Sequence, residues 1–284
     1  MDVEELELFR ASVAQAVASH SGKALDDALD ELGWQDALAV DRHAAVSTLF
    51  DLQGRANATS SALDVVMAGV LGIDGPVALP PLGSCDQPTH RGLGTFAFAN
   101  RIPDGATVRS VAGIDPTLEM VEVTGDLSAS PSCAWAAAVA AGQLALAHEL
   151  VGASRAMLQL ARDHAVERIQ FGRPIAAFQA VRHRLAESLV AIEAADAALD
   201  AAWDVESELN ARMAKAVAGR SARTVAKHCQ QVLAGIGFTT EHPFHRYLRR
   251  VLVLDGLLGD ARMLTTELGE QLLKTRQLPP PLPL

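Results

Sequence analysis

The second half of the chain limits its possible folds most, because it is helical in pattern almost throughout. An Ala- and Leu-rich run extends to about Arg168, with Ser130 or Ser132 as the expected cap. It ends at Phe-Gly-Arg-Pro, since Gly and Pro both disfavour a continued helix. Similar patterns follow over residues 177–203, 205–233 and 241–273. Four long helices predict a bundle over residues 131–276.

The first half reads differently and divides in two. Residues 1–71 have helical spacing in short pieces, which predicts a small N-terminal helical region. Residues 72–130 contain short apolar runs separated by Gly, Pro and Asp, which predicts a reduced β region of four strands. The Pro-rich residues 277–284 predict an extended tail. The expected fold is therefore mainly α.

Charge and composition exclude several classes of function. The formal net charge of −10 and the lack of a long Lys/Arg run argue against binding of nucleic acid. Cys85, Cys133 and Cys229 have no zinc-ligand spacing, and we expect reduced, mostly buried thiols. The acidic N-terminus does not match a signal peptide, and the Ala-rich runs are short for a membrane span. We therefore expect a cytoplasmic protein that binds no metal and no membrane.

One basic stretch, residues 166–187, contains Arg168, Arg173, Arg182 and Arg184 around Gln-Phe-Gly-Arg-Pro. An Arg at the end of a helix can make a two-pronged contact with phosphate. Arginines near helix ends also satisfy terminal carbonyls, so this stretch alone equally fits a turn between helices.

A second stretch, residues 230–250, ends one predicted helix with small residues and starts the next. Ala234, Gly235 and Gly237 would let a ligand approach the backbone closely, or would simply form a helix end and a tight turn. Thr239 or Thr240 is the expected cap of the helix that follows.

Together, in this order, the two stretches resemble the C-terminal domain of the acyl-CoA dehydrogenase family. That family has Arg-x-x-Phe-Gly-(Arg/Lys)-x-(Ile/Leu)-x-x-x-Gln, and later Gln-x-x-Gly-Gly-x-Gly-Phe-x-x-Glu with an Arg-Arg segment. The first motif is matched by Arg168, Phe171, Gly172, Arg173, Ile175 and Gln179. The second is matched by Gln231, Gly235, Gly237, Phe238, Glu241, Arg249 and Arg250, with Ala234 in place of the usual Gly.

The resemblance implies a helical domain, a β domain and a C-terminal four-helix bundle, with FAD reaching into a neighbouring subunit's bundle. It implies that Arg168 and Gln170 hold the FAD pyrophosphate region and that Phe171 packs on the cofactor. The residues implied on the adenosine side are Gln179, Gln231, Ala234 and Gly235.

The catalytic carboxylate of the family has no counterpart here. Its two family positions fall on Leu258 and on Gly142, which is followed by Gln143. The family's flavin-wrapping Thr-Glu-x-x-Ala-Gly-Ser-Asp stretch is also missing. Without a base the reaction slows by about 10²–10⁴-fold or more, so we assign no catalytic residue to this chain.

Some actinobacterial acyl-CoA dehydrogenases that resemble this chain are heterotetramers, in which a shorter subunit without an active site supports a full-length one. The resemblance thus implies such a subunit, with a steroid-derived or other bulky acyl-CoA bound mainly by the partner. One alternative is a homodimeric flavoenzyme with an unusual base, Glu149, Asp255 or Asp260, although such acids usually lie at surfaces. Another is a structural helical bundle; a di-iron site is disfavoured because no Glu-x-x-His pair occurs on the helices.

Overall fold

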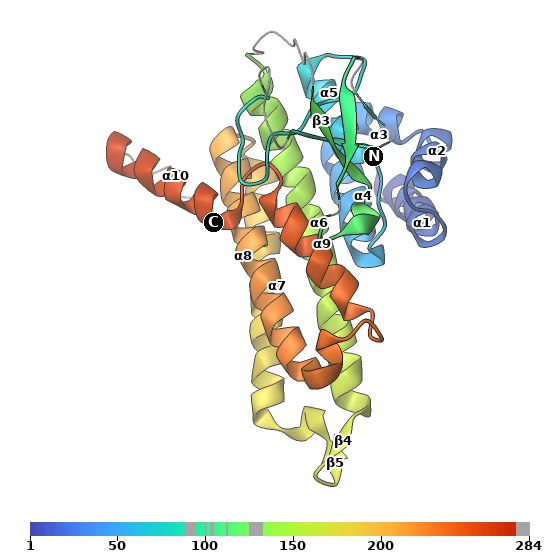
Figure 1. Cartoon of the computed structure of the whole chain (residues 1–284), viewed down its shortest axis with the longest axis vertical. Coiled ribbons are helices and arrows are strands. Elements are labelled where there is room, and N and C mark those ends of the chain that lie inside the picture. The colour runs from blue at the N-terminus through green and yellow to red at the C-terminus, as the bar shows by residue number, and fades with distance from the viewer. Residues whose placement is uncertain (89–94, 100, 103–104, 112, 125–132, 277–284) are drawn as a thin grey trace.

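The computed structural model describes residues 1–284 except 89–94, 100, 103–104, 112, 125–132 and 277–284 (Figure 1). The expected Ser130 or Ser132 cap and the Pro-rich tail lie outside the described residues. Helices dominate the rest, and the predicted mainly α fold is confirmed.

Five helices form the N-terminal region. Acidic caps start two of them: Asp2 forms a capping box with Glu5, and Asp41 accepts a hydrogen bond from the Ala44 N–H. The five are α1 (Val3–Ser19), α2 (Lys23–Glu31), α3 (Trp34–Val40), α4 (Arg42–Ala56) and α5 (Ala62–Leu71).

The small sheet follows. It contains β1 (Phe96–Phe98), β2 (Thr107–Ser110) and β3 (Met120–Thr124), all antiparallel in the order β1-β3-β2. A 3-10 turn, η1 (Pro116–Leu118), precedes β3, and an isolated bridge joins Leu79 to Phe96. The described residues thus hold three strands here where four were predicted, because the segment around Leu79 makes a single bridge only.

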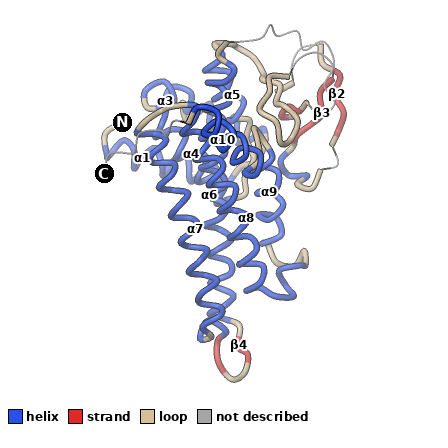
Figure 2. Tube along the Cα trace, turned by 90° about the vertical axis from the view of Figure 1, so that its left-hand side faces the viewer, coloured by secondary structure: helices blue, strands red, loops and turns tan. Residues whose placement is uncertain are grey.

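Three long helices form most of the bundle: α6 (Trp135–Glu167), α7 (Gln179–Asp204) and α8 (Glu208–Leu233). Between α6 and α7 the chain makes a short hairpin, β4 (Ile169–Gln170) and β5 (Arg173–Pro174), and the turn η2 (Ile175–Ala177). Figure 2 shows the hairpin and the small sheet at opposite ends of the bundle. Helix α6 is long and apolar enough to cross a membrane, but 83% of its apolar window is buried in the fold, as expected for a core helix.

The predicted fourth helix over residues 241–273 is wrong, because the structure has two helices there. After η3 (Ala234–Phe238), α9 spans Phe244–Gly256 and α10 spans Ala261–Thr275. The break occurs where Leu258 and Gly259 have φ of 53° and 93°, which a right-handed helix does not allow. The buried ammonium of Lys215 donates to the carbonyls of Asp255 and Gly259 at 2.9 and 3.2 Å and so holds this turn. Asp260 caps α10.

The expected Thr239 or Thr240 cap is also wrong, since η3 ends at Phe238 and α9 begins only at Phe244, with Pro243 before it. Pro243 suits that place because its fixed φ is compatible with a helix start.

The N-terminal region and the bundle meet where α4 crosses α6 with almost no space between the backbones. A Cβ on Gly54 would lie 2.2 Å from the Glu149 carbonyl oxygen, and one on Gly152 would lie 2.1 Å from the Asp51 carbonyl oxygen. Both positions therefore require glycine, and these two parts of the chain share one core.

Candidate cofactor site and the positions of the catalytic base

The first motif forms the tip of the bundle. The α6 helix ends at Arg168, and the hairpin turns at Phe171 and Gly172, with φ of 54° and 78°. Two successive residues of positive φ match the twist that a tight hairpin requires. Phe171 is 91% exposed, which is unusual for a large apolar ring.

Two of the four arginines in residues 166–187 have partners within the chain, as expected if this stretch is a turn between helices. The Arg182 Nε donates to the Ala176 carbonyl at 2.8 Å. Arg184 lies 3.8 Å from the Glu187 carboxylate, one helical turn along α7. Both contacts tie the start of α7 to itself or to η2, so neither arginine is needed to explain ligand binding.

The other two arginines differ. The Arg173 guanidinium lies over the Phe178 ring at 4.4 Å, and the Phe171 and Phe178 rings meet edge to face at 6.0 Å. Within the described part of the chain, the Arg168 side chain has no hydrogen bond or ion pair and is exposed. Arg168 therefore remains available to an anion.

The second motif ends α8. Ala234 adopts φ 53° and ψ −134°, a region that glycine populates far more readily than alanine. Gly235 follows, and a Cβ there would meet no atom within 4 Å, so space lies open above its backbone. Alanine in place of the usual Gly at position 234 therefore keeps the turn but strains its backbone.

Three neutral side chains, Gln170, Gln179 and Gln231, lie on these segments and are exposed. In the described ranges none of them has a side-chain hydrogen bond, so their amides are free to bind ribose or adenine. Arg168 supplies the charge, and the open backbone at Gly235 supplies a close approach. The residues therefore fit a dinucleotide such as FAD, although most of it would have to be held by another chain.

Among the described residues, no hydrogen bond, ion pair or ring contact joins the two groups directly. Two neighbouring histidines link them instead. His164 lies one turn before Arg168 on α6, and His242 lies in the segment between η3 and α9. Their rings meet edge to face with centroids 6.4 Å apart. The sequence analysis did not single out either histidine, since nothing in their spacing pairs them.

The two positions of the family's catalytic base meet inside the fold, and both are apolar. A Cβ on Gly142 would lie 2.5 Å from Leu258 Cδ1 and 3.1 Å from Met67 Sδ. Leu258 and Met67 are fully buried. The Gln143 amide donates to the Leu258 carbonyl at 2.9 Å and so fixes the turn. Apolar side chains therefore fill the space between these two positions.

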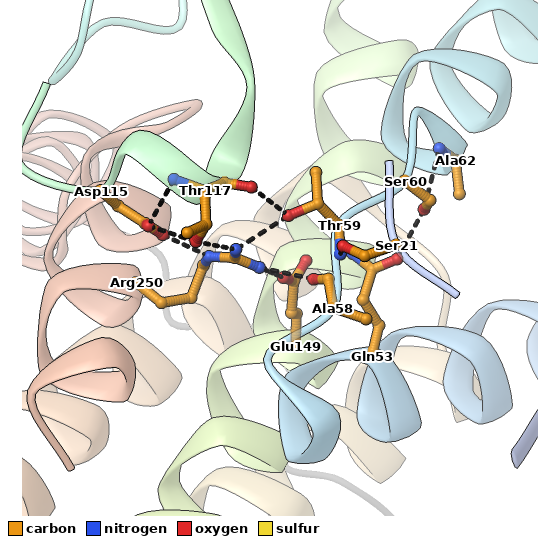
Figure 3. Close-up of polar contacts among 10 residues, drawn as sticks. All are labelled: Ser21, Gln53, Ala58, Thr59, Ser60, Ala62, Asp115, Thr117, Glu149 and Arg250. Atoms are coloured by element: carbon orange, nitrogen blue, oxygen red, sulfur yellow. Dashed lines mark hydrogen bonds and ion pairs between the residues drawn. The ribbon is translucent and has the colours of Figure 1, made fainter. Parts of the chain in front are cut away.

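Arg250 occupies the polar centre of the molecule (Figure 3). Its side chain is fully buried and links α9 to the N-terminal region, to the sheet region and to α6. Glu149 is 2% exposed and lies 3.4 Å from it. Burial raises the pKa of Glu149, and the Arg250 charge opposes this. The acceptors around the guanidinium are Asp115 Oδ2, Ala58 O, Glu149 Oε1, Thr59 Oγ1 and Thr117 Oγ1.

The expectation that the three nearby acids lie at the surface is wrong for two of them. Glu149 is buried against Arg250, and Asp255 is 1% exposed. Asp255 accepts from the Arg223 Nε and from the Ala261 N–H at 3.1 Å. Asp260 caps α10. All three carboxylates are therefore committed to partners, which a sequence pattern cannot show. The expectation of mostly buried cysteines is wrong for Cys133, which is exposed, whereas Cys229 is buried and Cys85 half-buried.

Comparison with known proteins agrees with this geometry. Residues 135–273 match the family model described as acyl-CoA dehydrogenase, C-terminal domain. Acyl-CoA dehydrogenase IpdE2 of Mycobacterium tuberculosis is 35% identical over 144 residues, which is 51% of this chain and 45% of that protein. Acyl-CoA dehydrogenase FadE34 of the same organism is 43% identical over 121 residues, 40% of this chain and 17% of that protein. The chain thus matches less than half the length of each of these two relatives.

Two solved structures share the fold over nearly the whole chain. A variant of the Tcur3481-Tcur3483 steroid ACAD has a TM-score of 0.79 at 21% identity and covers 96% of this chain and 99% of its own. The ChsE4-ChsE5 complex from Mycobacterium tuberculosis has a TM-score of 0.70 at 20% identity, covering 96% and 98%. Over residues 135–273 the chain belongs to the acyl-CoA dehydrogenase family.

Proposed function

We propose that this chain is a non-catalytic subunit of an FAD-dependent acyl-CoA dehydrogenase. It would present Arg168 and its neighbours to FAD held mainly by a catalytic partner. One observation carries the proposal: Gly142, Leu258 and Met67 pack together where the family's base would stand, whereas the Arg168 tip stays exposed. When bound, FAD supplies the acceptor for the hydride that leaves the acyl β-carbon.

Each exposed residue has a proposed role. Arg168 and Gln170 would bind the pyrophosphate region, and Phe171 would pack on the cofactor or on the partner that holds it. The amides of Gln179 and Gln231 would contact the adenosine side, with the backbone of Ala234 and Gly235 beside them. Support comes from their exposure, from the absence of side-chain hydrogen bonds to Arg168 and the three glutamines within the described residues, and from the match to both family motifs.

Independent catalysis with an unusual base is not supported by the acids that are present. Glu149 is paired with Arg250, Asp255 with Arg223, and Asp260 with the first turn of α10. A general base needs to reach the proton that it removes. A buried carboxylate that is already paired with an arginine is poorly placed to reach such a proton.

The names of two solved neighbours support the proposed partner and substrate class. One solved neighbour is a steroid ACAD, and another is a complex of two named components, ChsE4 and ChsE5. We propose a heterotetramer with a full-length acyl-CoA dehydrogenase subunit, acting on a bulky, steroid-derived acyl-CoA that the partner binds. A homodimer of this chain is the alternative assembly.

The test is to purify this chain alone and together with a full-length acyl-CoA dehydrogenase subunit, to be sought first in the adjacent gene. We expect a complex of both chains with half the flavin of a homotetramer, and no dehydrogenation by this chain alone. Stoichiometric FAD and activity in the chain alone would overturn the proposal. A complex without flavin would instead support a purely structural bundle.

Arg168→Ala tests the cofactor contact within that complex. Loss of a charge-assisted bond to phosphate is worth about 1.5–3 kcal/mol, so flavin affinity should fall by about tenfold or more. Arg162→Ala, which removes an exposed cation from the same helix, is the matched control and should retain flavin. Equal flavin content in both variants would show that the Arg168 tip is structural.

A further inference from the structure

The contact between His164 and His242 joins the two halves of the candidate cofactor site. His164 lies on the last turn of α6, and its carbonyl accepts the Arg168 N–H at 2.8 Å. Residues four apart on a helix share a face, so the His164 ring and the Arg168 side chain lie on one side of α6. His242 lies four residues after η3, beside the second motif.

The ring of His242 has a defined orientation. Its Nδ1 accepts the Phe244 N–H at 3.2 Å, so the neutral ring carries its proton on Nε2 and can donate from there. The His242 carbonyl lies 2.8 Å from His245 Nδ1. Both His164 and His242 are partly exposed, which leaves part of each ring accessible to a ligand.

Burial and the local charge both disfavour the protonated form of the two imidazoles, so the pKa of each lies below its usual value. Burial and the Arg168 charge lower the pKa of His164, with Glu167 acting in the opposite sense. Burial, His164 and His245 lower the pKa of His242. An anion placed beside Arg168 would offset these effects, because an opposite charge favours the protonated ring.

We propose that His164 and His242 are further anion-binding residues of the cofactor site, and that they take up protons when the pyrophosphate of a dinucleotide binds beside Arg168. This inference rests on the proposed function and adds to it. Neutral His242 supplies one hydrogen-bond donor. Once protonated, the pair surrounds the phosphates with two more positive charges than Arg168 alone provides.

Proton uptake on binding has a direct consequence, because linkage makes the flavin affinity rise as the pH falls. The pyrophosphate of FAD is esterified on both sides and keeps its charge near neutral pH, so the ligand itself does not titrate. The pH dependence then reports on the histidines, whose unperturbed pKa of about 6.5 lies in the measured range.

The experiment measures the dissociation constant of FAD in the complex with the partner subunit, by flavin fluorescence at about pH 6 and about pH 8. We expect affinity about tenfold higher at the lower pH, which one added charge-assisted contact would supply. His164→Gln and His242→Gln keep a polar side chain that does not titrate and should each reduce this ratio. The double variant should bring it close to one. His20→Gln, an exposed histidine at the end of α1, is the matched control.

Calorimetry of the unmodified complex in two buffers of different ionisation enthalpy gives a second measurement, and proton uptake on FAD binding is expected. No uptake, or a ratio that the double variant leaves unchanged, overturns this inference while the proposed function stands if Arg168→Ala still loses flavin. Absence of FAD from the complex overturns both.

Discussion

Gly142 and Leu258 lie against each other so closely that a single added methyl group on Gly142 would reach within 2.5 Å of Leu258 Cδ1. They are distant in sequence, and they are the two positions at which the family carries its catalytic carboxylate. Apolar contacts therefore fill the space between them. The predictions below test this packing and the other contacts on which the interpretation depends.

Gly142→Ala should destabilise the chain by about 1–3 kcal/mol, because the new methyl group overpacks a well-filled core. In a Leu258→Ala background the same change should cost much less, since the clashing Cδ1 is gone. Urea unfolding of the double-mutant cycle measures this coupling. Gly69→Ala, at an exposed position of α5, is the control and should be neutral or stabilising, since no atom lies within 4 Å of its Cβ. An additive cycle would contradict the contact.

Arg250→Met should destabilise the chain by about 3–5 kcal/mol, because it leaves Glu149 and Asp115 buried without a cation. Arg250→Lys should recover only part of this loss, because a point charge cannot reach acceptors on three elements. Arg249→Met, at the adjacent residue, is the control and should have a small effect. Chemical denaturation with far-ultraviolet circular dichroism would compare the three, and equal effects at the two arginines would refute the assigned role.

Ala234→Gly should stabilise the chain by about 1 kcal/mol, because glycine adopts φ 53°, ψ −134° without the steric cost that alanine has. At an exposed helical position the same replacement, Ala194→Gly, should destabilise by about the same amount. The opposite signs distinguish backbone strain from a general effect of glycine. The thermal midpoints of both variants check this, and a destabilised Ala234→Gly would show that the turn is unstrained.

Acid should destabilise the fold through His148. Burial lowers its pKa from 6.5 to about 3, and its Nε2 accepts a hydrogen bond from Trp203 Nε1 at 2.9 Å that protonation would break. Below pH 6.5 the unfolded chain takes up a proton that the folded chain does not, so stability falls by up to about 1.4 kcal/mol per pH unit towards pH 3.

Asp64 acts in the opposite direction over part of this range, because burial raises its pKa from 3.8 to about 6. The measurement is therefore the difference in unfolding free energy between the unmodified chain and His148→Gln as a function of pH. This difference should become less favourable to the unmodified chain as the pH falls below 6.5. A constant difference would mean that His148 does not titrate as described.

The sequence predicted the mainly α fold because helical spacing and the Gly-Pro break at Phe171–Pro174 are local signals. The prediction was wrong where the local structure depends on residues that are distant in the sequence. The break at Leu258 depends on a buried Lys215 that no pattern around the break reveals. The burial of Glu149 depends on Arg250, which lies about a hundred residues later in the chain.

The candidate site was predicted in the same uneven way. The two motifs located Arg168 and Gly235, whose exposure the structure then describes. The sequence could not show that Arg182 and Arg184 make contacts within the chain, since these contacts depend on the geometry of α7. The contact between His164 and His242 also could not be predicted, because it depends on how α6 packs against the segment before α9. The roles of the cofactor residues stay predictions until flavin binding is measured.

The contacts of Arg250 determine how this chain can be divided. The part that carries the family's sequence signature, residues 135–273, contains the guanidinium but not most of its acceptors, which lie on Ala58, Thr59, Asp115 and Thr117. A fragment that begins at Trp135 would expose the α6 face that packs on α4. It would also leave the buried Arg250 guanidinium without most of its acceptors. The bundle of this chain therefore depends on the region before it, and we expect separation at that boundary to destabilise both pieces.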